Sequence, residues 1–386
     1  MSVLEAKDIS FSYDHQRLFE DANMRLFQDD HAVLVGPNGH GKTTFLKFLA
    51  KELSPNKGNI SWLNHVKVGY LDRFLALRDD QTVEIYLHDV FEHLFQFESK
   101  MIGLYEEAST SNQAMRLIHH ASDIQDILEK EQFYQFKSKV DNMVQGLGLS
   151  LHVLKQPIAE LSGGMKVKVM LAKLLLQDVD VLLLDEPTNF LDKKHIEFLI
   201  QYLNQYKGAF LVISHDAYFL SKIAKTVFAI EGKKIEKYKG SFDFYLSQKA
   251  LRHAQAEKAF KEQQQLIKKE ETFIQKNLTR ASTTKRAQSR RKKLEKLVKI
   301  EKPHTKRSYH FDFPFAHRTG DVVIQTHDLL IGYDVPLLDP LNMEIRRGQK
   351  VALIGKNGIG KTTLLKTLLS EKSSLGGQFQ IGRAHV

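Results

Sequence analysis

The sequence contains no cysteine, which excludes disulfide bonds, thiolate metal sites and cysteine nucleophiles. No apolar run approaches the roughly 20 residues that a membrane-spanning helix needs. The first residues lack the basic start and the apolar core of a secretory signal, so we expect a cytoplasmic protein. The 386 residues, 42% hydrophobic and 26% charged, are typical of two or three globular domains.

Basic residues are concentrated in one segment. The chain carries a formal net charge of +10, and residues 251–310 alone hold 18 lysines and arginines against 6 acidic residues. The remainder of the chain is therefore slightly acidic. Such a segment predicts a polyanionic partner.

Two stretches of the chain repeat each other. LVGPNGHGKTTFLKFL, from Leu34, matches LIGKNGIGKTTLLKTL, from Leu353, and FSYD at 11–14 matches IGYD at 331–334. We therefore expect two similar domains on either side of the basic segment. Only 32 residues run from Gly355 to the end, so the second copy lacks a counterpart of everything beyond Lys67.

Short apolar segments alternate with helical patterns, which predicts an α/β fold with a largely parallel sheet. Residues 75–157 have apolar side chains at helical spacing and form a predicted helical insertion. Strands are expected at 3–11, 31–36, 66–71, 179–185 and 209–214.

Residues 244–276 contain no glycine or proline and predict a helix about 50 Å long. Polar residues at 277–284 interrupt this helix. A second, strongly basic helix is expected at 285–300, and Pro303 marks its end. Two long helices joined by a short tip form an αα-hairpin.

Gly36–Thr43 fits the pattern G-x-x-x-x-G-K-[ST] between a predicted strand and a predicted helix. The amides of such a loop wrap phosphate oxygens; Lys42 would reach the β- and γ-phosphates, and Thr43 would ligate Mg²⁺. The alternative is a plain glycine turn, which the second occurrence disfavours. The predicted nucleotide-binding residues are Gly36, Asn38, Gly39, Gly41, Lys42, Thr43 and Thr44, and in the second copy Gly355, Asn357, Gly358, Gly360, Lys361, Thr362 (also a metal ligand) and Thr363.

Val181–Glu186 is an apolar strand that ends in two carboxylates. Asp185 would hold Mg²⁺ through water, and Glu186 would act as the general base. The strand at 209–214 is followed by His215, which would contact the γ-phosphate and the attacking water. A buried strand ending in acids is common, but the phosphate loop upstream favours the catalytic interpretation.

Leu161–Met165 resembles the LSGGQ signature of ATP-binding-cassette (ABC) proteins, and Asn189–Asp192 resembles their D-loop. Ser162, Gly163 and Gly164 would bind a γ-phosphate at a helix start. Tyr13 and Tyr333 match the aromatic residue that stacks on adenine, although a strand tyrosine is more often part of a core. The resemblance implies the P-loop cassette fold, ATP and Mg²⁺ as cofactors, and hydrolysis to ADP and phosphate.

Two cassettes joined by a charged helical linker resemble the ABC-F subfamily. Phe273–Asn277 and Arg280–Arg290 are similar to the tip of its linker, and Tyr238–Tyr245 to the lead-in. This resemblance implies that the cassettes pair within one full-length chain and that the linker reaches rRNA and P-site tRNA on the ribosome. The implied RNA contacts are Arg280, Lys285, Arg286, Arg290, Arg291, Lys292 and Lys293.

Other interpretations stay open. The hairpin could be a solvated charged surface, and the protein could be the ATPase subunit of an ABC membrane transporter or a DNA-associated ATPase. Within the leading interpretation, a translation factor and an antibiotic-resistance ribosomal protection protein are not distinguished. Arg73, Met165 and Phe190 depart from the family pattern, which predicts slowed or differently regulated hydrolysis at the first site.

These expectations divide the chain into a first cassette (1–243), a linker (244–310), the N-terminal part of a second cassette (320–380) and a tail. The tail, IGRAHV at 381–386, is encoded by ATCGGAAGAGCACACGTC, a sequencing adapter, so we interpret it as non-native on a truncated reading frame. Natural truncation is the alternative. Because both nucleotide sites are incomplete in such a fragment, we expect ATP binding with little turnover.

Overall fold

The structure is a computed structural model with an α/β fold. It describes residues 1–13, 16–71, 80–110, 112–277, 284–298, 300, 321–355 and 358–382. The chain divides into two compact units, Met1–Leu63 with Leu220–Phe311 and Asn64–Phe219 with Asp312–Val386. No helix among the described residues is both long and apolar enough to cross a membrane.

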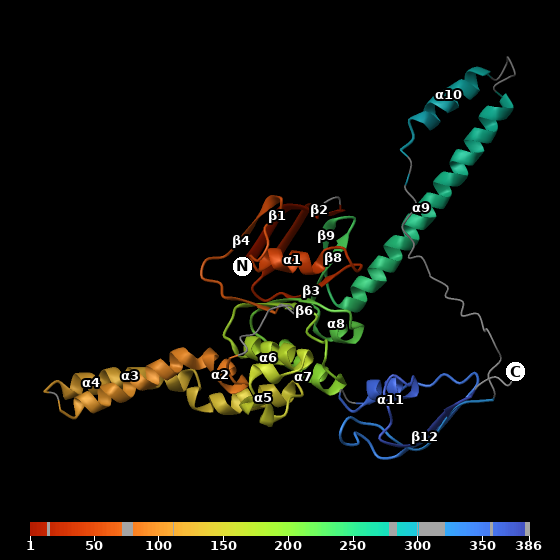
Figure 1. The fold of residues 1–386 in the computed structure, drawn as a ribbon. Helices are drawn as coiled ribbons and strands as arrows, with labels where there is room; N and C mark the ends of the chain where they lie inside the picture. Colours follow the sequence, from red (N-terminus) through yellow and green to blue (C-terminus); the bar gives the residue numbers. More distant parts are fainter. Residues whose placement is uncertain are drawn as a thin grey trace. The chain divides into compact units, whose positions relative to one another are not determined.

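The first unit contains a sheet that the sequence did not lead us to expect, because it is antiparallel. Its strand order is β2-β1-β4, formed by β1 (Ser2–Tyr13), β2 (Gln16–Phe27) and β4 (Lys57–Trp62). The rings of Phe19, Phe45 and Phe48 pack together between β2 and α1 (Lys42–Leu49). This aromatic core fixes the helix that follows the phosphate loop (Figure 1).

Three further strands of this unit are β3 (His31–Val35), β8 (Thr226–Glu231) and β9 (Lys234–Lys239). β3 pairs in parallel with β8, and β9 returns antiparallel to β8. All but the last residue of β3 are buried, as expected for a strand in the interior of a parallel sheet.

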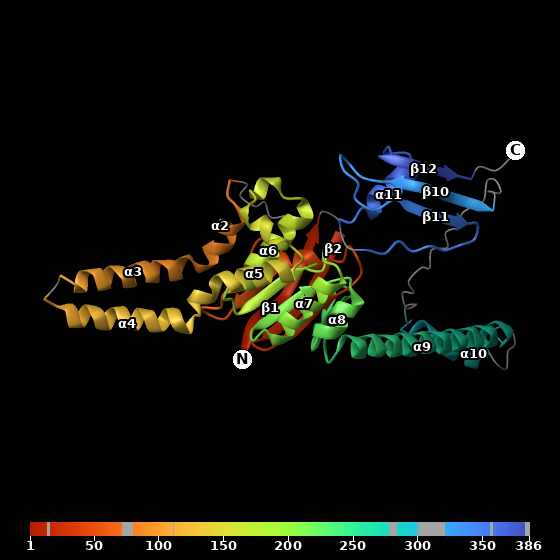
Figure 2. The ribbon, with the colours of Figure 1, turned by 90° about the horizontal axis from the view of Figure 1, so that it is seen from below.

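The second unit contains the parallel strands β5 (Val68–Leu71), β6 (Val181–Asp185) and β7 (Ala209–Ile213) in that order. Every residue of β6 and β7 is buried. The helices are α2 (Val83–His88), α3 (Glu92–Ala108), α4 (Ala114–Lys130), α5 (Phe136–Gly146), α6 (Gly163–Leu176) and α7 (Lys193–Gln205), with α8 (Ala217–Ile223) next in sequence; short 3-10 turns lie at Asp89–Phe91, Phe133–Gln135, Leu151–Lys155 and Ile158–Glu160. The expected helical insertion is therefore present, and α3 and α4 lie side by side as a hairpin (Figures 1 and 2).

The basic segment forms a long helix, α9 (Phe242–Asn277), and a shorter one, α10 (Thr284–Glu295), which lies along it (Figure 2). The expected hairpin is confirmed, but α10 ends at Glu295 rather than near residue 300. The Gln263 side-chain amide of α9 donates to the Val298 carbonyl and accepts from the Ile300 amide. In a continuing helix, the Val298 carbonyl and the Ile300 amide would bond to other backbone groups of that helix. Here both bond to the Gln263 side chain instead, so the helix ends before them.

The second sequence copy folds as β10 (Val322–Leu330), β11 (Leu341–Arg346), β12 (Gly376–Ile381) and α11 (Lys361–Leu368), with sheet order β11-β10-β12. Its small core joins Leu329 and Ile331 to Leu364 and Leu368. Residues 351–355, which match β3 of the first copy, form no strand, and Ile354 is 90% exposed. Among the described residues, this segment pairs with no neighbouring strand.

Candidate functional site

The phosphate loop of the first copy ends at Gly41, which precedes α1 and adopts a left-handed φ of 87°. A Cβ atom at Gly41 would lie 2.9 Å from ring carbons of Phe19, so the position combines a backbone conformation and a close approach that only glycine tolerates. The first turn of α1 carries no acidic side chain. Its amides and helix dipole are therefore available to a phosphate group.

Lys42 is buried and turns back over the loop. Its ammonium group donates to the Gly36 carbonyl oxygen at 2.9 Å and to the Pro37 carbonyl oxygen at 3.2 Å. Asn38 and Gly39 lie on the exposed side of the loop, while Thr43 and Thr44 are half-buried in the first turn of α1. The loop thus holds a cation among backbone groups, an arrangement that suits a polyphosphate.

Tyr13 lies at the end of β1 with 51% of its surface exposed. Its ring packs edge-on against Phe11, with centroids 4.8 Å apart, and Phe11 packs in turn against Phe48 of α1 at 5.0 Å. Phe11, which begins the repeated FSYD stretch, therefore ties Tyr13 to the helix of the phosphate loop. The exposed ring is suited to stacking on a flat aromatic base.

The predicted acids lie where β6 ends in the second unit. Asp185 is only 1% exposed and pairs with Ile213 of β7. Glu186 follows with a left-handed φ of 52°, and its amide donates to the Ile213 carbonyl oxygen at 2.8 Å. This turn keeps the Glu186 carboxylate beside the residues that follow β7.

His215 is brought to Glu186, because the two residues follow the neighbouring parallel strands β7 and β6. The imidazole Nε2 lies 3.3 Å from Glu186 Oε1, and the His215 amide donates to Glu186 Oε2 at 3.3 Å. A buried hydrogen bond of 3.0 Å between the hydroxyls of Thr188 and Ser214 ties the two loops together. The sequence analysis did not predict this hydrogen bond, because it depends on the register between β6 and β7.

The signature residues form the start of α6. The Ser162 hydroxyl accepts a hydrogen bond from the Met165 amide at 3.3 Å, and a Cβ at Gly163 would meet open space. A Cβ at Gly164 would lie 3.1 Å from the ring of Phe190. Phe190, with φ 68°, thus links the signature to the D-loop, whose Asp192 caps α7 by accepting from the His195 amide.

The second copy repeats the loop geometry. The Lys361 ammonium donates to the Gly355 carbonyl oxygen at 2.7 Å, and Gly358 and Gly360 both have positive φ. Thr362 is exposed, whereas Thr363 is buried; Asn357 lies outside the described residues. Tyr333 differs from Tyr13, because the Lys372 ammonium lies 3.3 Å from its ring centroid.

A magnesium ion fits these residues only together with a nucleotide. Among the described residues, no three histidine or acidic side chains converge on a point. A Mg²⁺ ion in a phosphate-transfer site takes most of its ligands from phosphate oxygens and water. Within the second unit, the Asp185 carboxylate is an oxygen donor of the kind that Mg²⁺ accepts. Within the first unit, the Thr43 hydroxyl is another.

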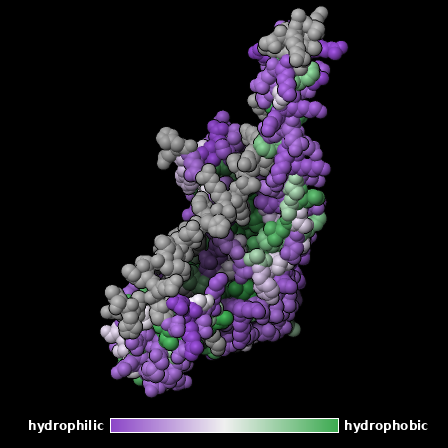
Figure 3. Space-filling model, turned by 90° about the vertical axis from the view of Figure 1, so that its right-hand side faces the viewer, coloured by the Kyte–Doolittle hydropathy of each residue, from purple (hydrophilic) through white to green (hydrophobic). Residues whose placement is uncertain are grey.

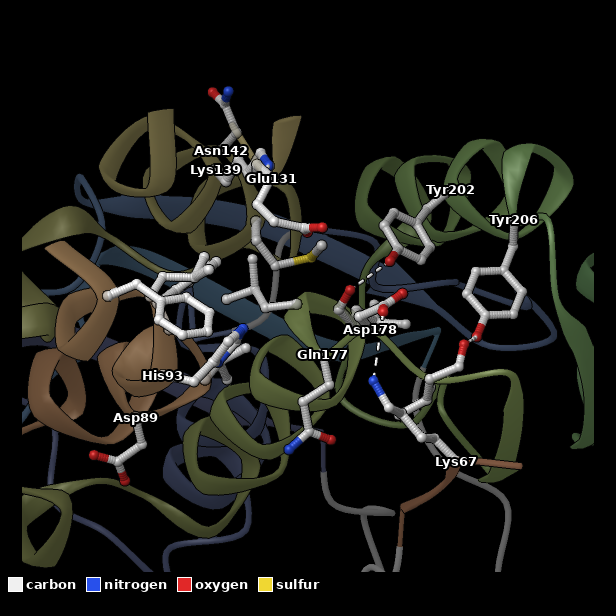
Figure 4. A pocket seen from close by; sticks show the side chains of 18 of the residues that line it. Lys67, Asp89, His93, Glu131, Lys139, Asn142, Gln177, Asp178, Tyr202 and Tyr206 are labelled. Carbon is white, nitrogen blue, oxygen red and sulfur yellow. Dashed lines mark hydrogen bonds and ion pairs between the residues drawn. The ribbon is translucent and has the colours of Figure 1, made fainter. Parts of the chain in front are cut away.

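A separate cavity of about 1040 Å³ lies in the second unit and is lined by residues of α3, α4, α5, α6 and α7 and of the segments next to them (Figure 4). The hydroxyls of Tyr202 and Tyr206 donate to the Leu175 and Val179 carbonyl oxygens at its wall. Val179 precedes β6, so the cavity lies at the strand end opposite Asp185 and Glu186. It is therefore distinct from the predicted catalytic residues.

The predicted RNA contacts divide into two groups. Arg290 and Arg291 form ion pairs with Glu270 and Glu295. Arg286, Lys292 and Lys293 are exposed. The described part of the upper projection in Figure 3 is mostly hydrophilic. Arg280 and the side chain of Lys285 lie outside the described residues, as does Arg73.

The base of α9 is fixed to β8 and β9 by ion pairs that the sequence analysis did not predict. Lys249 pairs with Glu231 at 2.6 Å, and Arg252 pairs with Glu236 at 2.6 Å. The Arg252 guanidinium also lies 4.9 Å from the Tyr238 ring centroid. These contacts fix the direction in which α9 leaves the strands.

Two family models match the chain, both described as ABC transporter, one over residues 19–189 and 338–386 and one over 228–313. The Bacillus subtilis "Uncharacterized ABC transporter ATP-binding protein YfmM" is 40% identical over 99% of this chain and 74% of its own. The Bacillus subtilis "Putative ATP-binding protein YdiF" is 37% identical over 96% and 58%. The Arabidopsis thaliana "ABC transporter F family member 2" is 29% identical over 100% and 58%. The chain thus spans 58 to 74% of the lengths of these relatives.

Proposed function

The chain belongs to the ABC transporter family of ATP-binding cassette proteins, and we propose that it hydrolyses ATP to ADP and phosphate with Glu186 as the general base. The observation that carries this proposal is the contact of His215 with the Glu186 carboxylate at the ends of two buried parallel strands. ATP and Mg²⁺ are the proposed cofactors.

The chain's own residues would divide the work as follows. The amides that lead into α1 and the Lys42 ammonium bind the phosphates, and Tyr13 stacks on the adenine ring. Glu186 accepts a proton from the attacking water, while His215 orients that water and contacts the γ-phosphate. Bound Mg²⁺ neutralises charge on the phosphate oxygens; Thr43 and Asp185 are its proposed protein ligands. In the second copy, Lys361 and Thr362 take the roles of Lys42 and Thr43, and Tyr333 that of Tyr13.

We further propose that the full-length protein is an ABC-F type ATPase of the cytoplasm and acts on the ribosome. The basic hairpin supports this role, because a charged helical projection serves a polyanionic partner such as RNA. The similarity to a protein named as an F family member also supports it. Whether the role is general translation or ribosomal protection against an antibiotic stays open within the proposal.

The alternative is the ATPase subunit of an ABC membrane transporter. The similarity to YfmM, an uncharacterized protein named as an ABC transporter ATP-binding protein, is compatible with this alternative. A ribosome-pelleting assay separates the two functions. We expect Glu186→Gln to accumulate on ribosomes with ATP, because binding would persist without hydrolysis, and to release as salt is raised. No ATP-dependent and salt-sensitive pelleting in the wild type or the variant would contradict the ribosomal role.

The ATPase proposal has a separate test. Phosphate release by the wild type should exceed that of Glu186→Gln at equal ATP occupancy, which a fluorescent ATP analogue measures. Slow turnover by the 386-residue chain stays a prediction, as do the domain boundaries and the individual site roles. Equal phosphate release by both proteins would overturn the assignment of Glu186.

A further inference from the structure

One basic side chain of α10 makes its contacts with the opposite helix of the hairpin. Nη1 of Arg290, on α10, donates to both carboxylate oxygens of Glu270, on α9, at 3.1 and 3.2 Å. The Arg290 guanidinium carbon also lies 4.0 Å from the ring centroid of Phe273, one turn further along α9. Arg290 thus combines an ion pair and a cation–π contact on one partner helix.

A second contact lies nearer the base of the hairpin. The Gln263 side-chain amide donates to the Val298 carbonyl oxygen at 2.8 Å, and its oxygen accepts from the Ile300 amide at 2.7 Å. The pairs 263 with 298 and 300, 270 with 290, and 273 with 290 are all symmetric about sequence positions 280–282. Only the Arg290 contacts join α10 itself to α9, and the Gln263 bonds fix the chain just beyond the end of α10 at positions that agree with the same register.

The other cations of α10 have different surroundings. Arg291 pairs with Glu295 of its own helix at 3.0 Å, a contact that does not join α10 to α9. Arg286, Lys292 and Lys293 are exposed, and within the part of the chain that the structure describes none of them has an ion pair. Among the described side chains of α10, these three are therefore the candidates for positive charge directed at a partner.

We propose that Arg290 is a positioning residue, which holds α10 in register on α9 through Glu270 and Phe273 and does not itself contact RNA phosphate. The proposal deepens the ribosomal function proposed above, because register decides how the basic face of α10 is presented. Arg286, Lys292 and Lys293 supply the phosphate contacts. A lysine at 290 keeps the charge but loses the planar guanidinium that spans a carboxylate and a ring.

The absence of cysteine allows a direct measurement on the full chain. Gln264 on α9 and Gln288 on α10 are exposed and uncharged. Gln264→Cys and Gln288→Cys can each carry a spin label, and the distribution of distances between the two labels reports the register of the helices. We expect Arg290→Lys and Glu270→Gln to broaden this distribution to a similar extent. The exchanged pair Glu270→Arg with Arg290→Glu recovers the ion pair but not the contact with the Phe273 ring, so it should narrow the distribution only in part. Arg286→Ala is the matched control and should leave the distribution unchanged.

Ribosome affinity supplies a second readout. Arg290→Lys and Glu270→Gln should each weaken binding about three- to tenfold with an unchanged salt slope, whereas Arg286→Ala should reduce that slope by about one. A phosphate contact at Arg290 predicts the opposite: Arg290→Lys retains affinity, Glu270→Gln has no cost, and the label distances stay narrow. That result would overturn the proposal. The distance measurement needs no ribosome, so it stands even where the ribosomal function fails.

Discussion

The imidazole Nε2 of His215 lies 3.3 Å from Oε1 of Glu186, and the backbone amide of His215 donates to Oε2 of the same carboxylate at 3.3 Å. One residue therefore contacts both carboxylate oxygens, once through its side chain and once through its main chain. The main-chain contact survives any substitution of the imidazole. This separation allows the position of the carboxylate and the chemistry of the histidine to be tested independently.

His215→Ala should lower the rate of ATP hydrolysis about 10²- to 10³-fold, because the water loses a polar contact next to its general base. The ATP dissociation constant should change less than about threefold. Steady-state phosphate release and a fluorescent ATP analogue measure the two quantities. Glu186→Gln is the comparison, since it keeps an oxygen for the His215 amide but cannot accept the proton. Hydrolysis by His215→Ala at the wild-type rate would remove His215 from the mechanism.

Gly41→Ala should destabilise the first unit and abolish ATP binding, because the new Cβ would lie 2.9 Å from the buried Phe19 ring. Gly39→Ala is the matched control. It has a similar positive φ of 77° but meets nothing within 4 Å, so it should cost only the left-handed strain of about 1–2 kcal/mol. Thermal unfolding without nucleotide compares them. Equal losses in the two variants would show that the contact with Phe19 is unimportant.

Tyr13→Ala should raise the ATP dissociation constant about fivefold, which corresponds to about 1 kcal/mol of stacking. Tyr13→Phe keeps the ring and should bind like the wild type. Tyr333→Ala should raise the ATP dissociation constant less than Tyr13→Ala does, because the Lys372 ammonium lies over the Tyr333 ring. Titration with a fluorescent ATP analogue measures all three. A loss in Tyr13→Phe as large as in Tyr13→Ala would assign the contribution to the hydroxyl instead.

Tyr202→Phe should make stability less dependent on alkaline pH. Burial raises the pKa of Tyr202 from the usual 10.0 to about 12. Because the folded pKa is the higher one, the stabilisation is complete below pH 10 and is lost as the pH rises towards 12. Between about pH 9 and about pH 11.5 the loss amounts to roughly 2 kcal/mol. Urea midpoints at about pH 9 and about pH 11.5 measure it, with the exposed Tyr134→Phe as control.

Local patterns in the sequence were sufficient to place the phosphate loop before a helix, and Glu186 and His215 after apolar strands. The contact between Glu186 and His215 was not predicted, because it depends on β6 and β7 being neighbours in the sheet. The loop motif is continuous in sequence, and residues that follow adjacent parallel strands meet at one sheet edge. The early end of α10 and the contacts of Arg290 with α9 were not predictable in this way. Both depend on the register between α9 and α10, which Gln263 and Glu270 set from distant positions in the sequence.

The antiparallel sheet was missed for a related reason. β2 alternates buried and exposed residues between Ala22 and Leu26, but polar residues surround this short run. Its antiparallel pairing with β1 is a contact between strands, which the sequence of β2 alone does not reveal. The link between Gly164 and Phe190 was also invisible in sequence. It joins two motifs that a linear comparison treats as separate.

Residues 351–355 form no strand, whereas the matching residues of the first copy form β3, and hydrogen exchange can measure this difference. Backbone amides of β3 should resist deuterium uptake for hours, since they lie in a buried, paired strand, whereas those of 351–355 should exchange within seconds. Peptides from the two repeats therefore form an internal reference within one molecule. Slowing of the second peptide on addition of any other polypeptide would report that a neighbouring strand has been supplied.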